Sequence, residues 1–138
     1  MNTFNKLLAS GEPMVLSIFR IITGLLIFQY GVAKIFKFPV LPYFANIPPL
    51  ITVAGALELV LGAMLILGLW TRPVAFILSG EMAAAYFMGH MFKTPAAPVF
   101  IPLLNGGNAA ILFCFGCLYF AFAGGGAWSA DAMMGKKR

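Results

Sequence analysis

The chain has 138 residues, enough for one domain, of which 62% are hydrophobic and only 9% are charged. A soluble domain uses about 25% charged residues to cover its exterior, so this composition excludes an ordinary soluble fold. The net charge is +5, but most basic residues lie singly between apolar runs, which argues against a nucleic-acid surface. We therefore expect an integral membrane protein whose exterior faces lipid.

The first apolar run covers residues 14–33 and is long enough to span a membrane. Pro13 precedes it, and proline suits the first turn of a helix. Arg20 lies inside the run and basic residues follow it, so it lacks the layout of a cleaved signal peptide, and we expect it to be retained. Four prolines in residues 38–49 forbid a continuous helix there and predict an ordered loop at the interface.

Three further apolar runs predict spans at residues 50–70, 74–91 and 105–123. A polar turn ending in Pro73 separates the second span from the third, and a connection at residues 93–102 with three prolines separates the third from the fourth. Glycines at positions 124–126 end the last span. The predicted fold is all-α, a single transmembrane domain over residues 1–138 built as a four-helix bundle.

The basic residues predict the orientation. Four spans place both termini on one side, together with Lys6, Arg72, Lys136, Lys137 and Arg138, against Lys34, Lys37 and Lys93 opposite. By the positive-inside rule both termini are cytoplasmic. The two proline-rich loops then share the outer face, where their apolar residues either roof the bundle or form plain interfacial connectors. Both alternatives remain open for Phe38, Tyr43, Phe44, Val99 and Phe100.

Arg20, Glu58 and Glu81 lie well inside predicted spans, where an ionised side chain costs at least a few kcal/mol and needs a partner. Arg20 also belongs to a stripe of residues on the first helix that recur at steps of three and four and that we expect to face the bundle, namely Arg20, Thr23, Gly24, Ile27, Gly31 and Lys34. We therefore predict that Arg20 is buried within reach of one glutamate. This candidate polar site is either a structural lock or a functional cluster in which one glutamate relays a proton while Arg20 holds the other ionised.

His90 is expected to anchor the outer loops by a hydrogen bond, because a lone histidine without a nearby carboxylate makes a metal site improbable. Cys114 and Cys117 have the spacing of thiol oxidoreductases but fall in the middle of a predicted span. Apolar surroundings make such thiols poor redox groups, so helix packing is their favoured role.

Three stretches together resemble the DoxX-like membrane proteins, small four-helix chains widespread in bacteria, over nearly the whole sequence. They are Arg20 through Gly31 with Lys34, then Glu58 with Gly62 and the turn Gly68-Leu69-Trp70-Thr71-Arg72, and last Gly124-Gly125-Gly126-Ala127-Trp128-Ser129-Ala130-Asp131. The segment from Glu81 to His90 and the run Asn105-Gly106-Gly107 are similar to the family's third helix and its outer entry to the fourth. With Asn108 they make a candidate outer-face site of His90, Asn105 and Asn108. Many relatives carry a glutamate where this chain has Asn108, so this chain departs from the family pattern at that position.

The family takes its name from a subunit of a terminal quinol oxidase, and relatives are similar to the membrane part of a thiosulfate:quinone oxidoreductase or to components of thiol-redox complexes. The resemblance implies a multi-pass protein of the bacterial inner membrane that serves as a subunit of a quinone- or thiol-linked redox complex. Quinone would be its cofactor and redox subunits its partners, and a homo-oligomer stays open. One histidine, no dinucleotide fingerprint and no cysteine cluster give no expectation of haem, flavin or metal.

Two other functions stay open. Some distant relatives resemble eukaryotic assembly chaperones, so the chain is alternatively a non-enzymatic membrane scaffold, an assembly factor or a small-solute carrier. Dithiol oxidation, as in relatives of vitamin K epoxide reductase, rests on the two cysteines alone and lacks a second shuttling pair.

Overall fold

A computed structural model describes residues 2–135, and in this range the regular structure is entirely helical. The predicted spans correspond to its four longest helical segments, the third of which continues without a break as a π-helix. The elements in chain order are α1 (Thr3–Phe36), the short 3-10 helix η1 (Pro42–Phe44), α2 (Pro49–Leu67), α3 (Thr71–Tyr86), the π-helix η2 (Phe87–Met91), α4 (Pro102–Asn105), α5 (Asn108–Ala123) and α6 (Ala130–Met133). Lys136, Lys137 and Arg138, which support the predicted orientation, lie outside the described residues.

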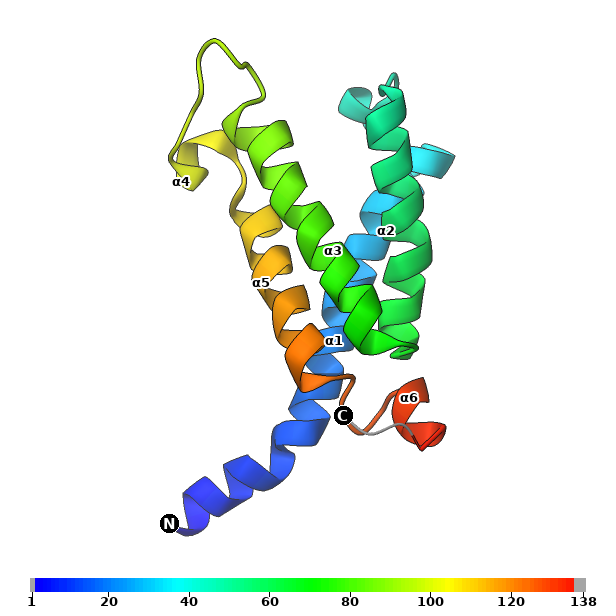
Figure 1. The fold of residues 1–138 in the computed structure, drawn as a ribbon, viewed down its shortest axis with the longest axis vertical. Helices are drawn as coiled ribbons and strands as arrows, with labels where there is room; N and C mark the ends of the chain where they lie inside the picture. Colours follow the sequence, from blue (N-terminus) through cyan, green and yellow to red (C-terminus); the bar gives the residue numbers. More distant parts are fainter. Residues whose placement is uncertain (1, 136–138) are drawn as a thin grey trace.

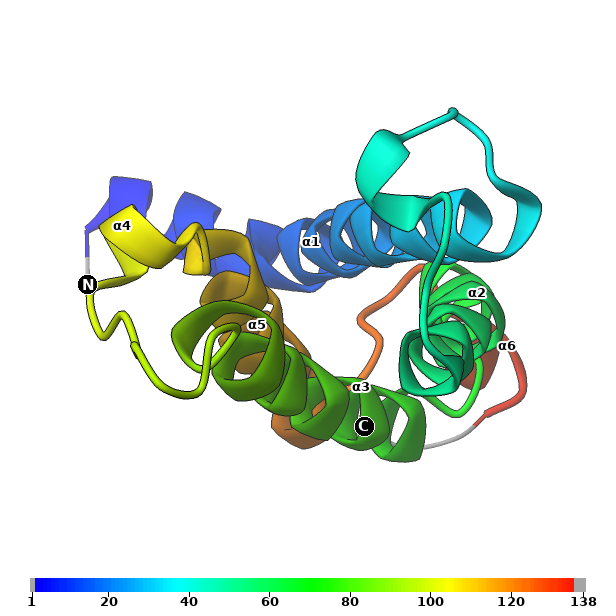
Figure 2. The ribbon, with the colours of Figure 1, turned by 90° about the horizontal axis from the view of Figure 1, so that it is seen from above.

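The long helices form two pairs, α1 with α2 and α3 with α5, and the pairs meet mainly through α2 and α3. The pairs lie side by side in both views (Figures 1 and 2). The two proline-rich loops lie at one end, which we call the loop end. The α2–α3 turn and residues 124–135 lie at the opposite end, which we call the turn end.

Helix α1 is longer than predicted. It begins at Thr3, where the Asn2 side chain accepts a hydrogen bond from the Asn5 backbone N–H at 2.9 Å and so caps the first turn. Pro13 therefore lies inside the helix rather than at its start. Proline lacks an N–H, which removes one backbone hydrogen bond and bends a helix. The N-terminal part of α1 accordingly lies at an angle to the rest of the helix (Figure 1).

Glycines on facing sides bring α1 and α2 close together. Gly24 and Gly31 of α1 are buried, as the predicted stripe requires, and they face buried Gly55 and Gly62 of α2. A Cβ atom on Gly31 would lie only 2.5 Å from the backbone nitrogen of Leu59. The two backbones therefore approach at a distance that glycine alone permits, as in membrane helix pairs with small residues at the interface.

The exterior is apolar over much of its surface. Helices α1 and α2 are long and apolar enough to cross a membrane, with mean hydropathies of 1.8 and 2.4, and α5 is a shorter apolar helix. Only 22% of the apolar window of α2 is buried inside the structure, so this hydropathy does not belong to a soluble core. Large side chains such as Phe76, Leu112 and Phe122 point outward from α3 and α5. These surfaces suit lipid rather than water.

The proline-rich loops do not roof the helices. Phe38, Tyr43, Val99 and Phe100 are all exposed, and the loops stand over different helix pairs at the loop end (Figure 1). Phe44 is half-buried and is the exception. Most of these residues therefore fit the second alternative, in which the loops are plain connectors, better than the first, in which they cover the end of the bundle.

Candidate functional site

An ion pair between the partly buried Lys34 and the buried Glu58 joins the two helices of the first pair. The ammonium group of Lys34, in the last turn of α1, donates to both carboxylate oxygens of Glu58 on α2, at 2.7 and 2.9 Å. Gly55, one turn before Glu58, leaves room for the Lys34 side chain, because a Cβ there would lie 2.8 Å from the lysine Cβ. The glycine contact therefore positions the lysine over the glutamate.

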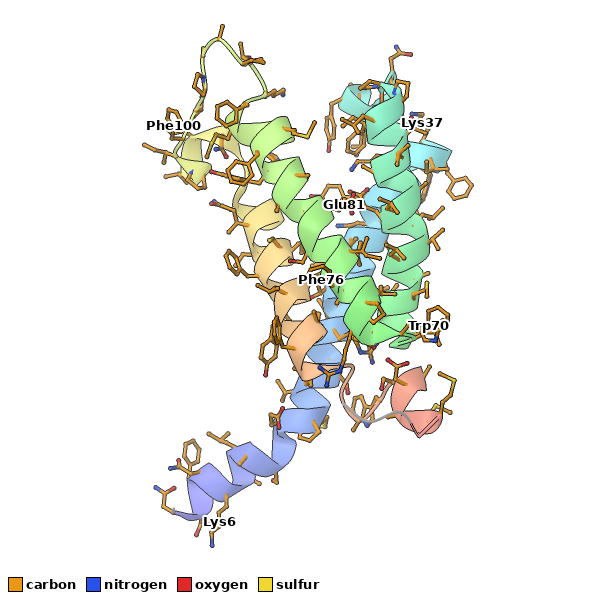
Figure 3. All side chains as sticks on the ribbon, viewed as in Figure 1. Lys6, Lys37, Trp70, Phe76, Glu81 and Phe100 are labelled. Carbon is orange, nitrogen blue, oxygen red and sulfur yellow. The ribbon has the colours of Figure 1, made fainter. Side chains whose placement is uncertain are left out.

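Glu81 on α3 adds a second carboxyl group to this pair. It lies near enough to Glu58 and Lys34 to interact electrostatically with both, and it occupies the region between α3 and the α1–α2 pair (Figure 3). Both of its carboxylate oxygens are buried, yet no group within residues 2–135 donates a hydrogen bond to either of them. We call Lys34, Glu58 and Glu81 the carboxylate cluster.

Aromatic rings border the cluster. The Lys34 Nζ atom lies 5.9 Å from the centre of the Tyr30 ring and 5.5 Å from the centre of the Phe44 ring, within the range of cation–π attraction. Tyr30 in turn meets Phe113 of α5 edge to face, with ring centres 6.4 Å apart. The lysine is thus held by one carboxylate and two rings.

Arg20 is fully buried, as predicted, but the predicted pairing with a glutamate is wrong. Its guanidinium group donates to four backbone carbonyls instead, at 2.6 to 2.8 Å. These carbonyls belong to Leu65, Ile66, Gly125 and Trp128. The last carbonyls of a helix lack intrahelical partners and carry the negative end of its dipole, so the end of α2 accepts an arginine as a carboxylate would. Glu58 lies seven residues earlier on α2, about 10 Å further along the axis.

The turn end contains two more charged residues that serve helix ends. Asp131 accepts hydrogen bonds from the backbone N–H groups of Trp70 and Thr71, both at 2.8 Å, where α3 begins. Asp131 also interacts electrostatically with Arg20. Arg72 donates to the carbonyls of Ala121 and Phe122 at the end of α5. We call Arg20, Arg72, Asp131 and the loop at residues 124–129 the latch.

Sequence reasoning missed the partners of both sites. Lys34 was available as the last polar residue of the predicted stripe, one turn after Gly31. Asp131 was available in the C-terminal stretch, but no local rule joins it to a helix start sixty residues earlier. A lysine near the end of a membrane helix is usually expected to extend its amine to the interface. For this reason the sequence did not predict that Lys34 points inward to Glu58.

The outer-face candidates come together only in part. His90 Nδ1 lies 3.0 Å from the carbonyl oxygen of Asn105, so the histidine anchors the loop as predicted. The Asn105 side chain donates to the Val99 carbonyl at 2.9 Å and to the Tyr86 hydroxyl at 3.3 Å. Asn108 opens α5 and is exposed, and within residues 2–135 its side chain makes no hydrogen bond to this group. The arrangement holds the loop-end connection in place.

The two cysteines lie on α5 as free thiols. Cys117 is completely buried in the apolar core beside residues such as Phe120, and the Cys114 carbonyl accepts a hydrogen bond from Ser79 of α3 at 2.8 Å. Their surroundings fit the predicted packing role.

The carboxylate cluster is chemically unbalanced. With both acids ionised, two negative charges face one ammonium group, so the charge balance has room for one proton or one other monovalent cation. Residues 2–135 contain no group of three or more histidine, cysteine, aspartate and glutamate side chains placed to hold a metal ion. The cluster can therefore bind and release a proton at a Glu81 oxygen, beside a lysine that hydrogen bonds to Glu58.

These features define a class: a small helical protein with lipid-suited surfaces and an ion cluster between its helix pairs. The sequence profile of the DoxX family matches residues 15–91, more than half of the chain, and the chain belongs to the DoxX family. It is 41% identical over 129 residues to an uncharacterized protein of Haemophilus influenzae, covering 91% of this chain and 95% of that relative. No solved structure matches. Family membership and the two long apolar helices indicate a membrane protein.

Proposed function

We propose that this protein is a membrane subunit of a quinone-linked redox complex, in which Glu81 exchanges a proton with a bound lipophile. The observation that carries the proposal is the pair of buried Glu81 oxygens without a hydrogen-bond donor, beside a complete Lys34–Glu58 ion pair. Buried polar groups in proteins are nearly always satisfied, and the exceptions often have a functional reason. An intramembrane acid is a functional candidate by the same reasoning.

The cluster residues suit the head group of a quinone. A quinone presents carbonyl oxygens that accept hydrogen bonds, and its quinol presents hydroxyl groups that donate them. Lys34 would donate to the former, a Glu81 oxygen would accept from the latter, and Tyr30 and Phe44 would flank the ring. A quinone supplies such a site with a couple of two electrons and two protons.

The remaining parts of the proposal concern partners and orientation. The chain has a single histidine and no dinucleotide fingerprint, so electrons would come from a redox centre on a partner subunit. We place the turn end on the cytoplasmic side of a bacterial inner membrane, because Lys6 and Arg72 lie toward this end whereas Lys34, Lys37 and Lys93 lie toward the loop end. Four crossings follow if α3 and η2 act as one span.

The alternative is a non-enzymatic scaffold, assembly factor or small-solute carrier. The latch favours it, because all four hydrogen bonds of the Arg20 guanidinium within residues 2–135 go to backbone carbonyls and so stabilise helix ends rather than a ligand. Under this alternative the carboxylate cluster fixes the helix pairs against each other, and no lipophile depends on Glu81.

Quinone binding tests the proposal. The protein is purified from native membranes in nanodiscs, its lipids are extracted, and quinone is measured by mass spectrometry for the wild type, Glu81→Gln and the control Glu12→Gln. Glu12 is an exposed acid on α1 far from the cluster. We expect quinone in the wild type and the control, and at least a tenfold loss in Glu81→Gln. Equal quinone in all three, or none in the wild type, would favour the scaffold.

Reporter fusions test the orientation separately. A fusion after Ala45, in the first loop, is expected to report the outer side, and a fusion after Arg138 the cytoplasm. A cytoplasmic result at Ala45 contradicts the four-crossing arrangement, whatever the quinone measurement shows.

A further inference from the structure

Helix α1 is too long for the membrane it crosses. Its 34 residues extend about 51 Å at 1.5 Å per residue, whereas the hydrocarbon core is about 30 Å thick and needs about 20 residues. The part of α1 after Pro13 packs against α2 and contains the buried Arg20 and the partly buried Lys34. The excess therefore lies at the N-terminal side, in residues 3–13.

This excess segment is amphipathic. Phe4, Leu7 and Leu8 are spaced by three and four residues, so they share one face, and they are 64%, 68% and 59% exposed. Polar side chains occupy the remaining surface at Asn5, Lys6 and Ser10, and Glu12 lies at the edge of the apolar face, four residues after Leu8. None of the three apolar side chains belongs to the hydrophobic core of the described chain.

The apolar face continues the outward face of the membrane-spanning part. Positions 4, 8, 11, 15, 18 and 22 follow one another in helical steps of three and four residues. Beyond Pro13 this line joins large exposed apolar side chains of α1, namely Val15, Ile18, Ile22, Leu25 and Leu26. The surface that meets acyl chains in the span thus extends without interruption along the first turns of α1.

We infer that residues 3–12 form an interfacial helix that lies in the cytoplasmic leaflet, with Phe4, Leu7 and Leu8 inserted at the boundary between head groups and acyl chains. The bend near Pro13 (Figure 1) lets this segment leave the line of the span while the chain stays helical. Amphipathic helices with a polar face toward water occupy this depth.

A lipid surface fits the segment better than a partner protein does. The apolar face is continuous with the lipid-facing side of the same helix, and the segment carries one basic and one acidic residue, Lys6 and Glu12, without the charge excess that selects a charged partner. The inference rests on the membrane orientation proposed above and is independent of quinone binding.

Spin labels measure the depth of the segment directly. In a Cys114→Ala, Cys117→Ala background, single labels at Leu8→Cys and at the matched polar-face control Ser10→Cys are placed in vesicles of phosphatidylethanolamine and phosphatidylglycerol. Collision rates with oxygen, which concentrates in lipid, and with a water-soluble nickel chelate are compared. We expect the oxygen-to-nickel ratio to exceed unity at position 8 and to fall below unity at position 10.

Equal, nickel-dominated values at both positions would show a helix in water and overturn the inference. Protection of position 8 from both reagents would show a protein contact and overturn it too. A label at Ile22→Cys in the span separates this outcome from failure of α1 to cross the bilayer, because Ile22 reports lipid whenever α1 does so, and the reporter fusions test the orientation.

A second measurement uses the unaltered chain, in case the cysteine-free background fails to fold. A phospholipid with a photoreactive diazirine near its glycerol is activated in the same vesicles, and the labelled residues are identified by mass spectrometry. Labelling at Phe4, Leu7 and Leu8 with little at Asn5 and Ser10 supports the interfacial helix. Labelling confined to residues after Pro13 overturns it.

Discussion

The latch and the carboxylate cluster both contain buried charges, but they differ in how completely those charges are satisfied. In the latch, Arg20 donates to four backbone carbonyls, and Asp131 accepts from two backbone N–H groups. In the cluster, one lysine faces two acids, and both oxygens of Glu81 lack a donor. The charges of the latch satisfy backbone groups at helix termini, whereas the cluster contains carboxylate oxygens that accept no hydrogen bond from the described residues.

The difference indicates where function is to be sought. A charge that replaces missing backbone partners at a helix end stabilises the fold and has little capacity left for a ligand. A buried acceptor without a donor destabilises the fold, and such a group persists where it has another use. The predictions below break or sharpen this contrast.

Replacing Arg20 should have the largest effect on folding. Arg20→Met leaves four carbonyls without their donor and removes the charge beside Asp131, so the free energy of unfolding should fall by about 3 to 5 kcal/mol, as for broken buried ionic groups. Unfolding in mixed detergent micelles measures this loss, and Lys93→Met, at an exposed loop position, is the control. Adding Glu58→Gln to Arg20→Met should not restore stability. A rescue would show that arginine and glutamate are coupled after all.

Breaking the Lys34–Glu58 pair should cost somewhat less. Lys34→Met alone leaves Glu58 without its donor and should lower the free energy of unfolding by about 3 kcal/mol. The double variant Lys34→Met, Glu58→Gln removes both charges and should recover much of that loss, since the two residues form one interaction. Strict additivity of the two single changes would contradict the ion pair.

The glycine contact between α1 and α2 should tolerate no side chain. Gly31→Ala places a Cβ 2.5 Å from the Leu59 backbone nitrogen, and separating the helices should cost about 1 to 3 kcal/mol. Gly80→Ala on α3 is the matched control, because no atom lies within 4 Å of its Cβ position. That change should leave stability equal or slightly raised. An equal loss of unfolding free energy at both glycines would mean that the cost comes from a change in helix flexibility and not from the close contact between α1 and α2.

The two cysteines should matter least. The double change Cys114→Ala, Cys117→Ala removes only packing atoms and should lower the free energy of unfolding by about 1 kcal/mol. Quinone content should stay at the wild-type level. Trapping a mixed disulfide on either thiol in native membranes would contradict a packing role.

The helices could be predicted from the sequence because long apolar runs separated by prolines and glycines fix them locally. The start of α1 could not be predicted, since Pro13 looked like a first-turn residue and the helix tolerates it as a bend. The π-helical end of the third span and the short helix at Pro102 also carry no clear local pattern. The pairing of the helices depends on contacts between distant residues.

The sequence predicted the two acids of the carboxylate cluster, Glu58 and Glu81, but not its cation, Lys34. A glutamate inside a membrane span requires a cationic partner. Arg20 was the natural candidate, because it also lies well inside a predicted span. The sequence does not show that the end of α2 offers Arg20 better acceptors, or that Gly55 makes room for Lys34. Backbone carbonyls compete with carboxylates for a buried arginine, and only the three-dimensional arrangement decides between them.

Glu81→Gln distinguishes the functional acid from the structural one most directly. The amide has nearly the same shape, and the carboxylate oxygens that it replaces accept no hydrogen bond from residues 2–135, so the variant should fold with wild-type stability, whereas Glu58→Gln weakens the ion pair with Lys34 and should be destabilised. Infrared difference spectra recorded on electrochemical reduction of quinone in the nanodisc-embedded protein then follow the carboxyl groups. We predict one carboxylic C=O band that changes with reduction in the wild type and in Glu12→Gln and is absent in Glu81→Gln. A band that survives in Glu81→Gln, or a Glu81→Gln variant that unfolds as readily as Glu58→Gln, would contradict the assignment of Glu81 as the proton-exchanging group.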